Sequence, residues 1–180
     1  MKYASEDLME EHEGILFGLK ILEKMVNNLG GKNKPDDEDF REMINFLKLF
    51  ADKCHHGKEE NYLFKEMLAQ GIPNENGPIG AMLQEHAQGR AYIAQMSQSL
   101  EAKDLVGFQN AAKQYRDLLR GHITKENFVL FMIADQVIDE ESQEQMFEDF
   151  ELFEETVVGH GVHEELHAMI DTWAEAFGMG

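Results

Sequence analysis

Apolar residues recur at alternating spacings of four and three along much of the chain, and this periodicity limits the possible folds more than any other feature. A helix places residues with that spacing on one stripe of its surface, whereas a strand would need strict alternation. Each stripe is apolar except for one histidine near its N-terminal end. The first stripe comprises Leu8, His12, Ile15, Leu19, Leu22, Val26 and Leu29, and the second comprises Ile79, Met82, His86, Gly89, Ile93, Met96 and Leu100.

Proline and glycine, which interrupt helices, mark the breaks between these segments. All three prolines lie in two turn-like stretches, at residues 30–37 and 71–80. The remaining chain is rich in Leu, Met, Glu, Lys and Ala, which favour helix. We therefore expect two further helices, from about Asp37 to about Gln70 and from about Asp104 to about Val137.

Four long helices with short links predict an all-α fold, an up-down-up-down four-helix bundle at about residues 5–137. An additional C-terminal helical segment follows at about residues 141–177, interrupted near Gly159-His-Gly161. A chain of 180 residues is long enough to bury a sizeable core, and we expect residues 1–180 to form a single domain.

The charge balance limits what such a chain can bind. Asp and Glu number 35 against 16 Lys and Arg, and the net charge of −19 repels nucleic-acid phosphates and anionic lipids. No apolar run approaches the roughly 20 residues that a membrane-spanning helix needs, and the N-terminus lacks the apolar part of a signal peptide. The single cysteine, Cys54, is expected to be a small buried residue. We expect a cytoplasmic protein that binds neither nucleic acid nor membranes.

The two helices expected at residues 37–70 and 104–137 contain the same local pattern. In each, a His is followed four residues later by Glu and four residues later again by Leu-Phe. Residues four apart share one helix face, so each helix offers an imidazole beside a carboxylate. Together with the single histidines of the other two stripes, six side chains would project into the bundle: His12, His55, Glu59, His86, His122 and Glu126.

The doublets His55-His56 and Glu59-Glu60 leave two possible registers for the second helix. The row Leu47, Ala51, His55, Glu59 and Leu63 is more apolar than the row Lys48, Asp52, His56, Glu60 and Phe64. We therefore expect His55 and Glu59 to face the core, and His56 and Glu60 to face solvent.

These inward side chains predict a metal centre. An unpaired buried carboxylate is very costly, whereas a bound cation stabilises it. One zinc ion needs only about four ligands, so six inward donors favour a dinuclear site. Imidazoles with two carboxylates that are able to bridge suit two iron ions.

The motifs that contain these residues resemble, as an ordered set, the hemerythrin-like (HHE cation-binding) family over about residues 5–135. The resemblance implies a four-helix bundle with a non-haem di-iron centre, in which Glu59 and Glu126 bridge and the four histidines are terminal ligands. The motifs are Glu-Glu-His12-Glu, His55-His-Gly-Lys-Glu59, Gln84-Glu-His86 and His122-Ile-Thr-Lys-Glu126.

Two positions differ from the hemerythrins that carry oxygen. Arg90 stands where they have a His and Asn127 where they have an Asp. The sequence is closer to the branch with two His-x-x-x-Glu pairs, which includes iron-sulfur cluster repair proteins of nitrosative stress. The resemblance therefore implies binding or sensing of O2, NO or a related small oxidant. The alternatives are a di-iron enzyme that reduces peroxide or NO, an iron donor for cluster repair, and an iron store or sensor.

Further histidines lie in the C-terminal segment. His163 falls on an apolar stripe that must pack on the bundle, where it either supplies a fifth imidazole in the place left by Arg90 or is a buried His with a backbone partner. His167 is the second choice for that role, and His160 is expected to be exposed. The string His163-Glu-Glu-Leu-His167 also matches the His-Glu-x-x-His pattern of zinc metallopeptidases, but no convincing third ligand follows it.

Overall fold

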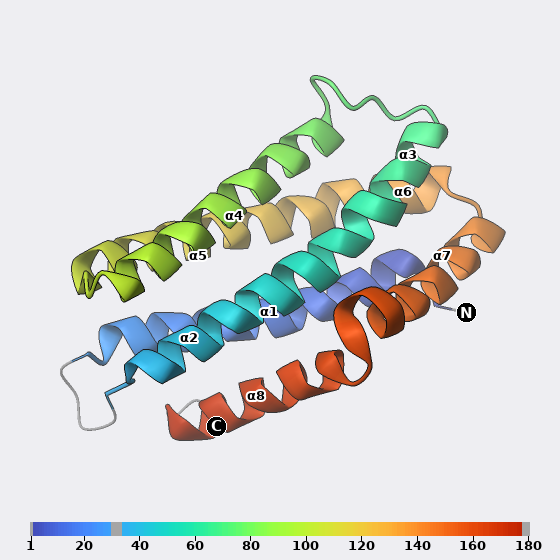
Figure 1. Cartoon of the computed structure of the whole chain (residues 1–180). Coiled ribbons are helices and arrows are strands. Elements are labelled where there is room, and N and C mark those ends of the chain that lie inside the picture. The colour runs from blue at the N-terminus through green and yellow to red at the C-terminus, as the bar shows by residue number, and fades with distance from the viewer. Residues whose placement is uncertain (1, 30–33, 178–180) are drawn as a thin grey trace.

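The computed structural model describes residues 2–29 and 34–177, and four helical rods of alternating direction form its bundle (Figure 1). The first rod is α1 (Ala4–Asn27) and the third is α4 (Pro78–Glu101). The second rod passes through α2 (Asp37–Phe46), η1 (Leu47–His56), η2 (Glu59–Leu63) and α3 (Phe64–Ala69). The fourth passes through α5 (Leu105–Lys125), η3 (Glu126–Leu130) and α6 (Phe131–Val137). The predicted all-α four-helix bundle is confirmed.

Local sequence explains where the rods begin. Asp36 accepts a hydrogen bond from the backbone N–H of Asp39 at the start of α2, and Asp104 accepts one from Gly107 at the start of α5. Pro78 takes the first position of α4, where its missing N–H costs nothing. The turn predicted at 71–80 corresponds to the link before α4, whereas the turn predicted at 30–37 lies partly outside the described residues.

The two larger of three buried apolar clusters fill the bundle. One contains Phe46, Phe50 and Trp173, and the other contains Phe64 and Phe131. Along each rod, the predicted His and Glu positions lie between residues of one cluster and residues of the other. The polar side chains therefore form a layer that apolar packing closes from both ends of the bundle.

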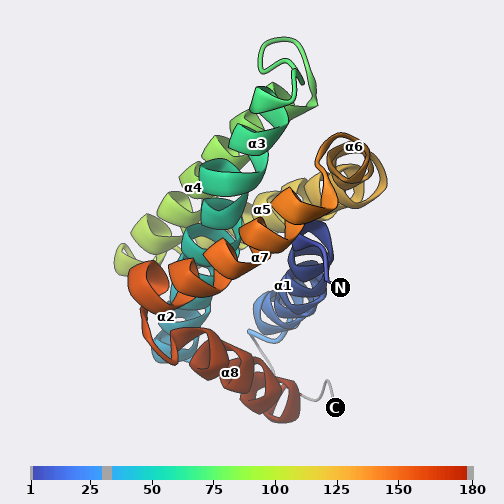
Figure 2. The ribbon, with the colours of Figure 1, turned by 90° about the vertical axis from the view of Figure 1, so that its right-hand side faces the viewer.

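The C-terminal segment comprises α7 (Glu140–Phe153), η4 (Glu154–Gly159) and α8 (Val162–Ala176), as predicted for an additional helical segment. The chain turns sharply between α7 and α8 (Figure 2), where Gly159 and Gly161 have φ angles of 123° and 75°. Glycine adopts this left-handed region without the steric cost that a side chain would add.

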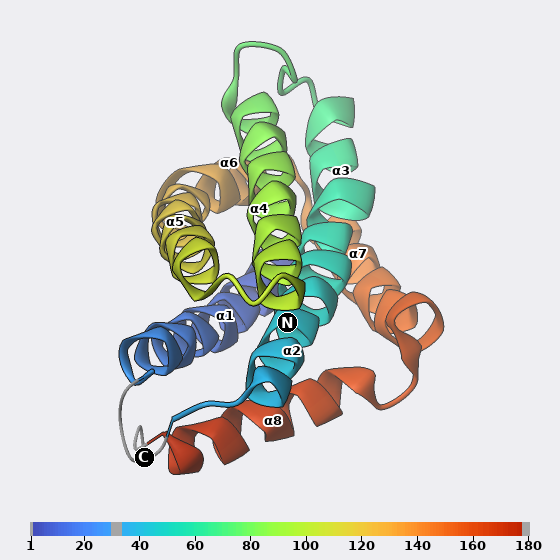
Figure 3. The ribbon, with the colours of Figure 1, turned by 60° about the vertical axis from the view of Figure 1, so that its left-hand side comes forward.

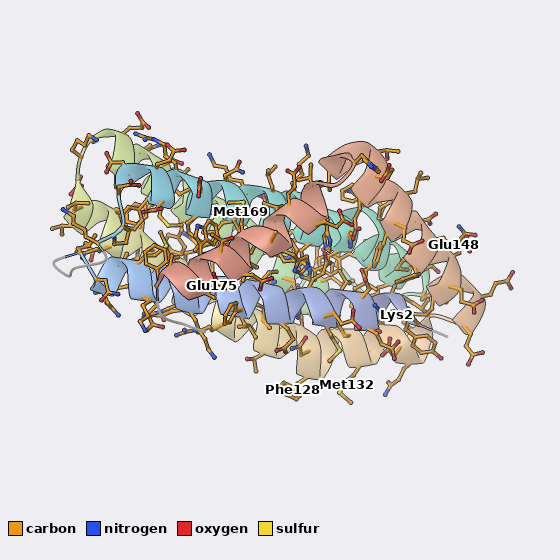
Figure 4. All side chains as sticks on the ribbon, turned by 90° about the horizontal axis from the view of Figure 1, so that it is seen from below. Lys2, Phe128, Met132, Glu148, Met169 and Glu175 are labelled. Atoms are coloured by element: carbon orange, nitrogen blue, oxygen red, sulfur yellow. The ribbon has the colours of Figure 1, made fainter. Side chains whose placement is uncertain are left out.

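The last helix lies across α1 and α2 on one side of the bundle (Figure 3). Figure 4 shows the same arrangement from below, with α8 marked by Met169 and Glu175. Its Leu166, Ile170 and Trp173 are buried in the cluster that contains Phe46, and the rings of Trp173 and Phe46 meet edge to face at 5.8 Å. Within the described residues, no helix is both long and apolar enough to cross a membrane.

Candidate metal centre

Buried His and Glu side chains gather in the polar layer as two sets that share Glu59. Within each set, one donor atom from every residue lies within 4.8 Å of the others. The first set comprises His12, His55, Glu59 and Glu126, and the second comprises His56, Glu59, His86 and His122. All of these residues are buried.

Both carboxylates face imidazoles of both sets. Glu59 Oε1 lies 3.2 Å from His55 Nε2 and 3.6 Å from His86 Nε2. Glu126 lies 3.0 Å from His12 Nε2 through one oxygen and 2.9 Å from His122 Nε2 through the other. A carboxylate that bridges two ions needs this position between two groups of terminal ligands.

Six of these buried atoms have no hydrogen-bond partner: Nε2 of His12 and His55, and both oxygens of Glu59 and Glu126. The short nitrogen–oxygen distances between them do not have hydrogen-bond geometry. Buried polar atoms are normally paired, and unpaired charged oxygens are the most costly. Carboxylate oxygens and imidazole nitrogens are also donors that divalent metal ions accept. The unpaired atoms therefore fit bound cations.

Each imidazole of the two sets has a hydrogen-bond partner at Nδ1, one of its two ring nitrogens. The Nδ1 nitrogen lies within hydrogen-bond distance of a side-chain oxygen, and this arrangement requires that Nδ1 carry the proton and donate it. Metal-binding histidines typically have such partners, which fix the ring and leave Nε2 free for the ion. The five pairs are His12–Asn127 at 2.6 Å, His55–Glu11 at 3.2 Å, His56–Asp52 at 3.2 Å, His86–Glu60 at 3.2 Å and His122–Glu85 at 2.8 Å.

The electrostatics of the layer give the carboxyl groups of Glu59 and Glu126 different pKa values. Burial, together with the charge of Glu126, raises the pKa of Glu59 well above its ordinary value. Burial alone would also raise the pKa of Glu126, but His122 and His12 hold it well below its ordinary value. Burial alone would lower the pKa of His122, but Glu126 and Glu85 raise it to about 10. The pair therefore keeps one proton unless a cation neutralises both carboxylates.

The structure brings six of the seven predicted donors into the two sets: His12, His55, Glu59, His86, His122 and Glu126. The seventh, His163, lies elsewhere, and it is grouped with Glu11, Cys54 and Glu154. Its Nε2 is 3.4 Å from Glu11 Oε2. The reason is the course of the C-terminal segment: α8 packs against α1, whereas Arg90 belongs to α4. His163 therefore does not take the place left by Arg90.

The expectation that His56 faces solvent is wrong. Its side chain is 3% exposed, and it joins His86 and His122 in the second set. The cause is the π-helix η1, whose i→i+5 hydrogen bonds put more residues into each turn than an α-helix has. Rows drawn for an α-helix drift out of phase there, so His55 and His56 both point inward. Glu60, also expected in solvent, is 26% exposed and holds Nδ1 of His86.

Comparison with known proteins agrees with this geometry. The family model of the hemerythrin HHE cation binding domain matches residues 3–134. No curated protein and no solved structure matches the chain significantly. The matched range contains all residues of the two sets and ends before α7.

Proposed function

Because the chain belongs to the hemerythrin HHE cation-binding family, we propose that its two His/Glu sets hold two iron ions and that this centre binds or senses O2, NO or a related small oxidant. The six unpaired buried donor atoms are the observation that carries the proposal. One ion would require fewer donors than the layer offers, and the carboxylates of Glu59 and Glu126 lie between the two groups of imidazoles.

In this proposal His12 and His55 would hold one ion, His86 and His122 would hold the other, and Glu59 and Glu126 would be shared by both. Iron would supply redox-active, Lewis-acidic positions at which a small molecule can be held. The chain supplies the orientation: Asn127, Glu11, Glu60 and Glu85 hold the imidazoles from outside.

The surroundings of the layer favour a small uncharged ligand. Phe131 stacks on His12 with ring centroids 5.3 Å apart, and Phe64 stacks on His86 at 5.8 Å. These rings belong to the apolar cluster that closes one end of the layer, so they shield that end from bulk water. O2 and NO are small and weakly hydrated, and this environment suits them better than it suits a charged substrate.

Anaerobic loading with Fe(II), followed by metal analysis, tests the centre itself. We expect about two irons per chain in the parent protein, and loss of at least one in Glu59→Ala and Glu126→Ala. Glu38→Ala, on the exposed start of α2, is the control. One tightly bound zinc ion without iron uptake would contradict the di-iron centre.

Absorption spectra of the loaded protein with O2, NO and peroxide then test the ligand. A stable spectrum of an O2 or NO adduct supports the proposed binding or sensing role. Sustained consumption of peroxide or NO would instead indicate the enzyme alternative. A centre that binds two irons and reacts with none of the three would indicate an iron store or sensor.

A further inference from the structure

The second set contains His56, which lies outside the pair His55-x-x-x-Glu59 that the sequence analysis placed in the core. We propose that His56 is a fifth metal-ligating imidazole and that it completes the ion held by His86 and His122. This inference rests on the dinuclear centre proposed above, and it assigns a role to a residue that the sequence pattern placed in solvent.

The position of the ring supports ligation. His56 lies in η1 directly after His55, and its side chain is buried in the polar layer. One of its ring nitrogens lies within 4.8 Å of donor atoms of Glu59, His86 and His122. The ring of His56 is stacked on the ring of His86, with centroids 3.8 Å apart and planes 15° from parallel. The stack brings the two imidazoles together from neighbouring helices. Because the lone pairs of nearly parallel rings do not converge on one point, ligation of a common ion requires one ring to tilt out of this stack.

The hydrogen bond on the outer side of His56 is the second argument. Nδ1 lies 3.2 Å from Asp52 Oδ1, one turn earlier in the same helix. His12, His55, His86 and His122 each have an oxygen partner at the same nitrogen. His56 thus shares the arrangement that directs Nε2 of the other four toward the layer.

Arg90, at the surface, binds the two carboxylates that contact His56 and His86. Its Nε donates to both oxygens of Asp52 at 2.9 and 3.1 Å, and its terminal nitrogens donate to Glu60. Asp52 and Glu60 are the partners of His56 and His86. Arg90 cannot bind a metal because it stays protonated. It acts as a positioning residue for two imidazoles of the second set.

A fifth imidazole makes the two ions unequal. With Glu59 and Glu126 shared as proposed, the ion beside His12 and His55 would have two imidazoles, whereas the other would have three. The first ion then keeps more coordination positions open.

Cobalt(II) provides the test, because its visible absorption depends on the number and geometry of its ligands. The full chain and three variants are loaded with Co(II) without oxygen, and both the bound metal and the visible spectrum are measured. His56→Asn keeps a side-chain N–H for Asp52 but lacks Nε2, and His56→Phe keeps a ring on His86 but has no nitrogen. His160→Asn, on an exposed histidine, is the control.

We expect the parent protein and His160→Asn to bind two Co(II) with the same spectrum. Both His56 variants should bind the second ion at least about 10-fold more weakly, with a changed spectrum. Helical circular dichroism verifies that each variant folds, and either variant alone decides the question. Retention of both ions and of the parent spectrum in His56→Phe would show that His56 is only a stacking neighbour. Failure of the parent protein to bind two ions would overturn the dinuclear centre as well, so the two failures are distinguishable.

Discussion

At the scale of single residues, Glu11 connects the proposed centre to the C-terminal segment. One of its oxygens accepts a hydrogen bond from Nδ1 of His55 at 3.2 Å. The other accepts from Lys58 at 3.2 Å and faces His163 Nε2 at 3.4 Å. Burial alone would raise the pKa of Glu11, but His163, His55 and Lys58 hold it far below its ordinary value. Glu11 therefore stays ionised and fixes the ring of His55.

Replacing Glu11 should consequently affect both metal binding and stability. Glu11→Gln keeps the shape but removes the charge that pairs with Lys58 and His163. We expect metal affinity to fall about 10-fold or more, as for other partners of metal-binding histidines. In the metal-free protein, the free energy of unfolding should fall by roughly 1–3 kcal/mol. Urea unfolding and metal titration measure the two effects.

Glu13→Gln, on an exposed position of the same helix, is the matched control and should change neither quantity. Loss of stability without loss of metal affinity would show that Glu11 serves only to neutralise Lys58.

Cys54 is the second residue whose surroundings predict a measurable property. It is buried, and its thiol donates a hydrogen bond to Glu11 at 3.6 Å. Burial, together with the charge of Glu11, raises the pKa of Cys54 far above its ordinary value. Because only the thiolate reacts readily, alkylation by iodoacetamide at pH 8 should be much slower in the native protein than in urea. Equal rates in both conditions would contradict the burial and the raised pKa.

At the scale of helices, sequence periodicity predicts the bundle well but predicts only part of the site. The helices expected at 37–70 and 104–137 agree closely with rods that span Asp37–Ala69 and Leu105–Val137. Apolar spacing and proline positions set these bounds, and both are local properties of the chain. The inward face of His56 depends instead on the π-helix η1, which a search for α-helical period cannot reveal. In the sequence, the doublet His55-His56 was the feature that left the inward position of His56 possible.

The position of His163 could not be predicted for a different reason. Its stripe in α8 predicted that the helix packs on the bundle, and Leu166, Ile170 and Trp173 are buried as that stripe requires. Which rods α8 crosses depends on the turn at Gly159 and Gly161, which sets the direction of the helix. A single amphipathic stripe carries no information on that direction.

Packing of α8 should contribute strongly to stability and little to metal content. Trp173 is 3% exposed, and it lies against Phe46 in the larger apolar cluster. Trp173→Ala should lower the free energy of unfolding by about 3–5 kcal/mol because it leaves a cavity. Iron stoichiometry should stay unchanged, since Trp173 is outside both His/Glu sets.

Leu152→Ala, on a residue that is 62% exposed in α7, is the comparison and should cost less than about 0.5 kcal/mol. Urea unfolding measures both variants. A small effect of Trp173→Ala would indicate that α8 contributes little to the bundle.

At the scale of the whole molecule, the bundle and the C-terminal segment share a core. The apolar cluster that contains Phe46 and Phe50 of the second rod also contains Leu166, Ile170 and Trp173 of α8. The segment lies outside the residues that the family model matches, yet it contacts Glu11, which holds His55. These contacts support the proposal that residues 1–180 form a single domain in which the segment stabilises one side of the centre.

Metal binding should raise the stability of this whole unit, because a bound cation offsets the cost of burying the Glu59 and Glu126 carboxylates in the polar layer. An ion that binds only the folded chain stabilises it by about 2.7 kcal/mol at a free concentration of 100 times its Kd. For a chain of this size, each kcal/mol raises Tm by about 2–4 °C, so iron-loaded protein should melt at least about 5 °C above metal-free protein. Differential scanning calorimetry under anaerobic conditions measures the shift. Glu59→Gln should lose most of the shift without lowering the metal-free Tm, because the raised pKa of Glu59 already keeps this group neutral without metal, and a neutral amide cannot bridge. Identical Tm values for metal-free and iron-saturated parent protein would contradict the coupling between the centre and the fold.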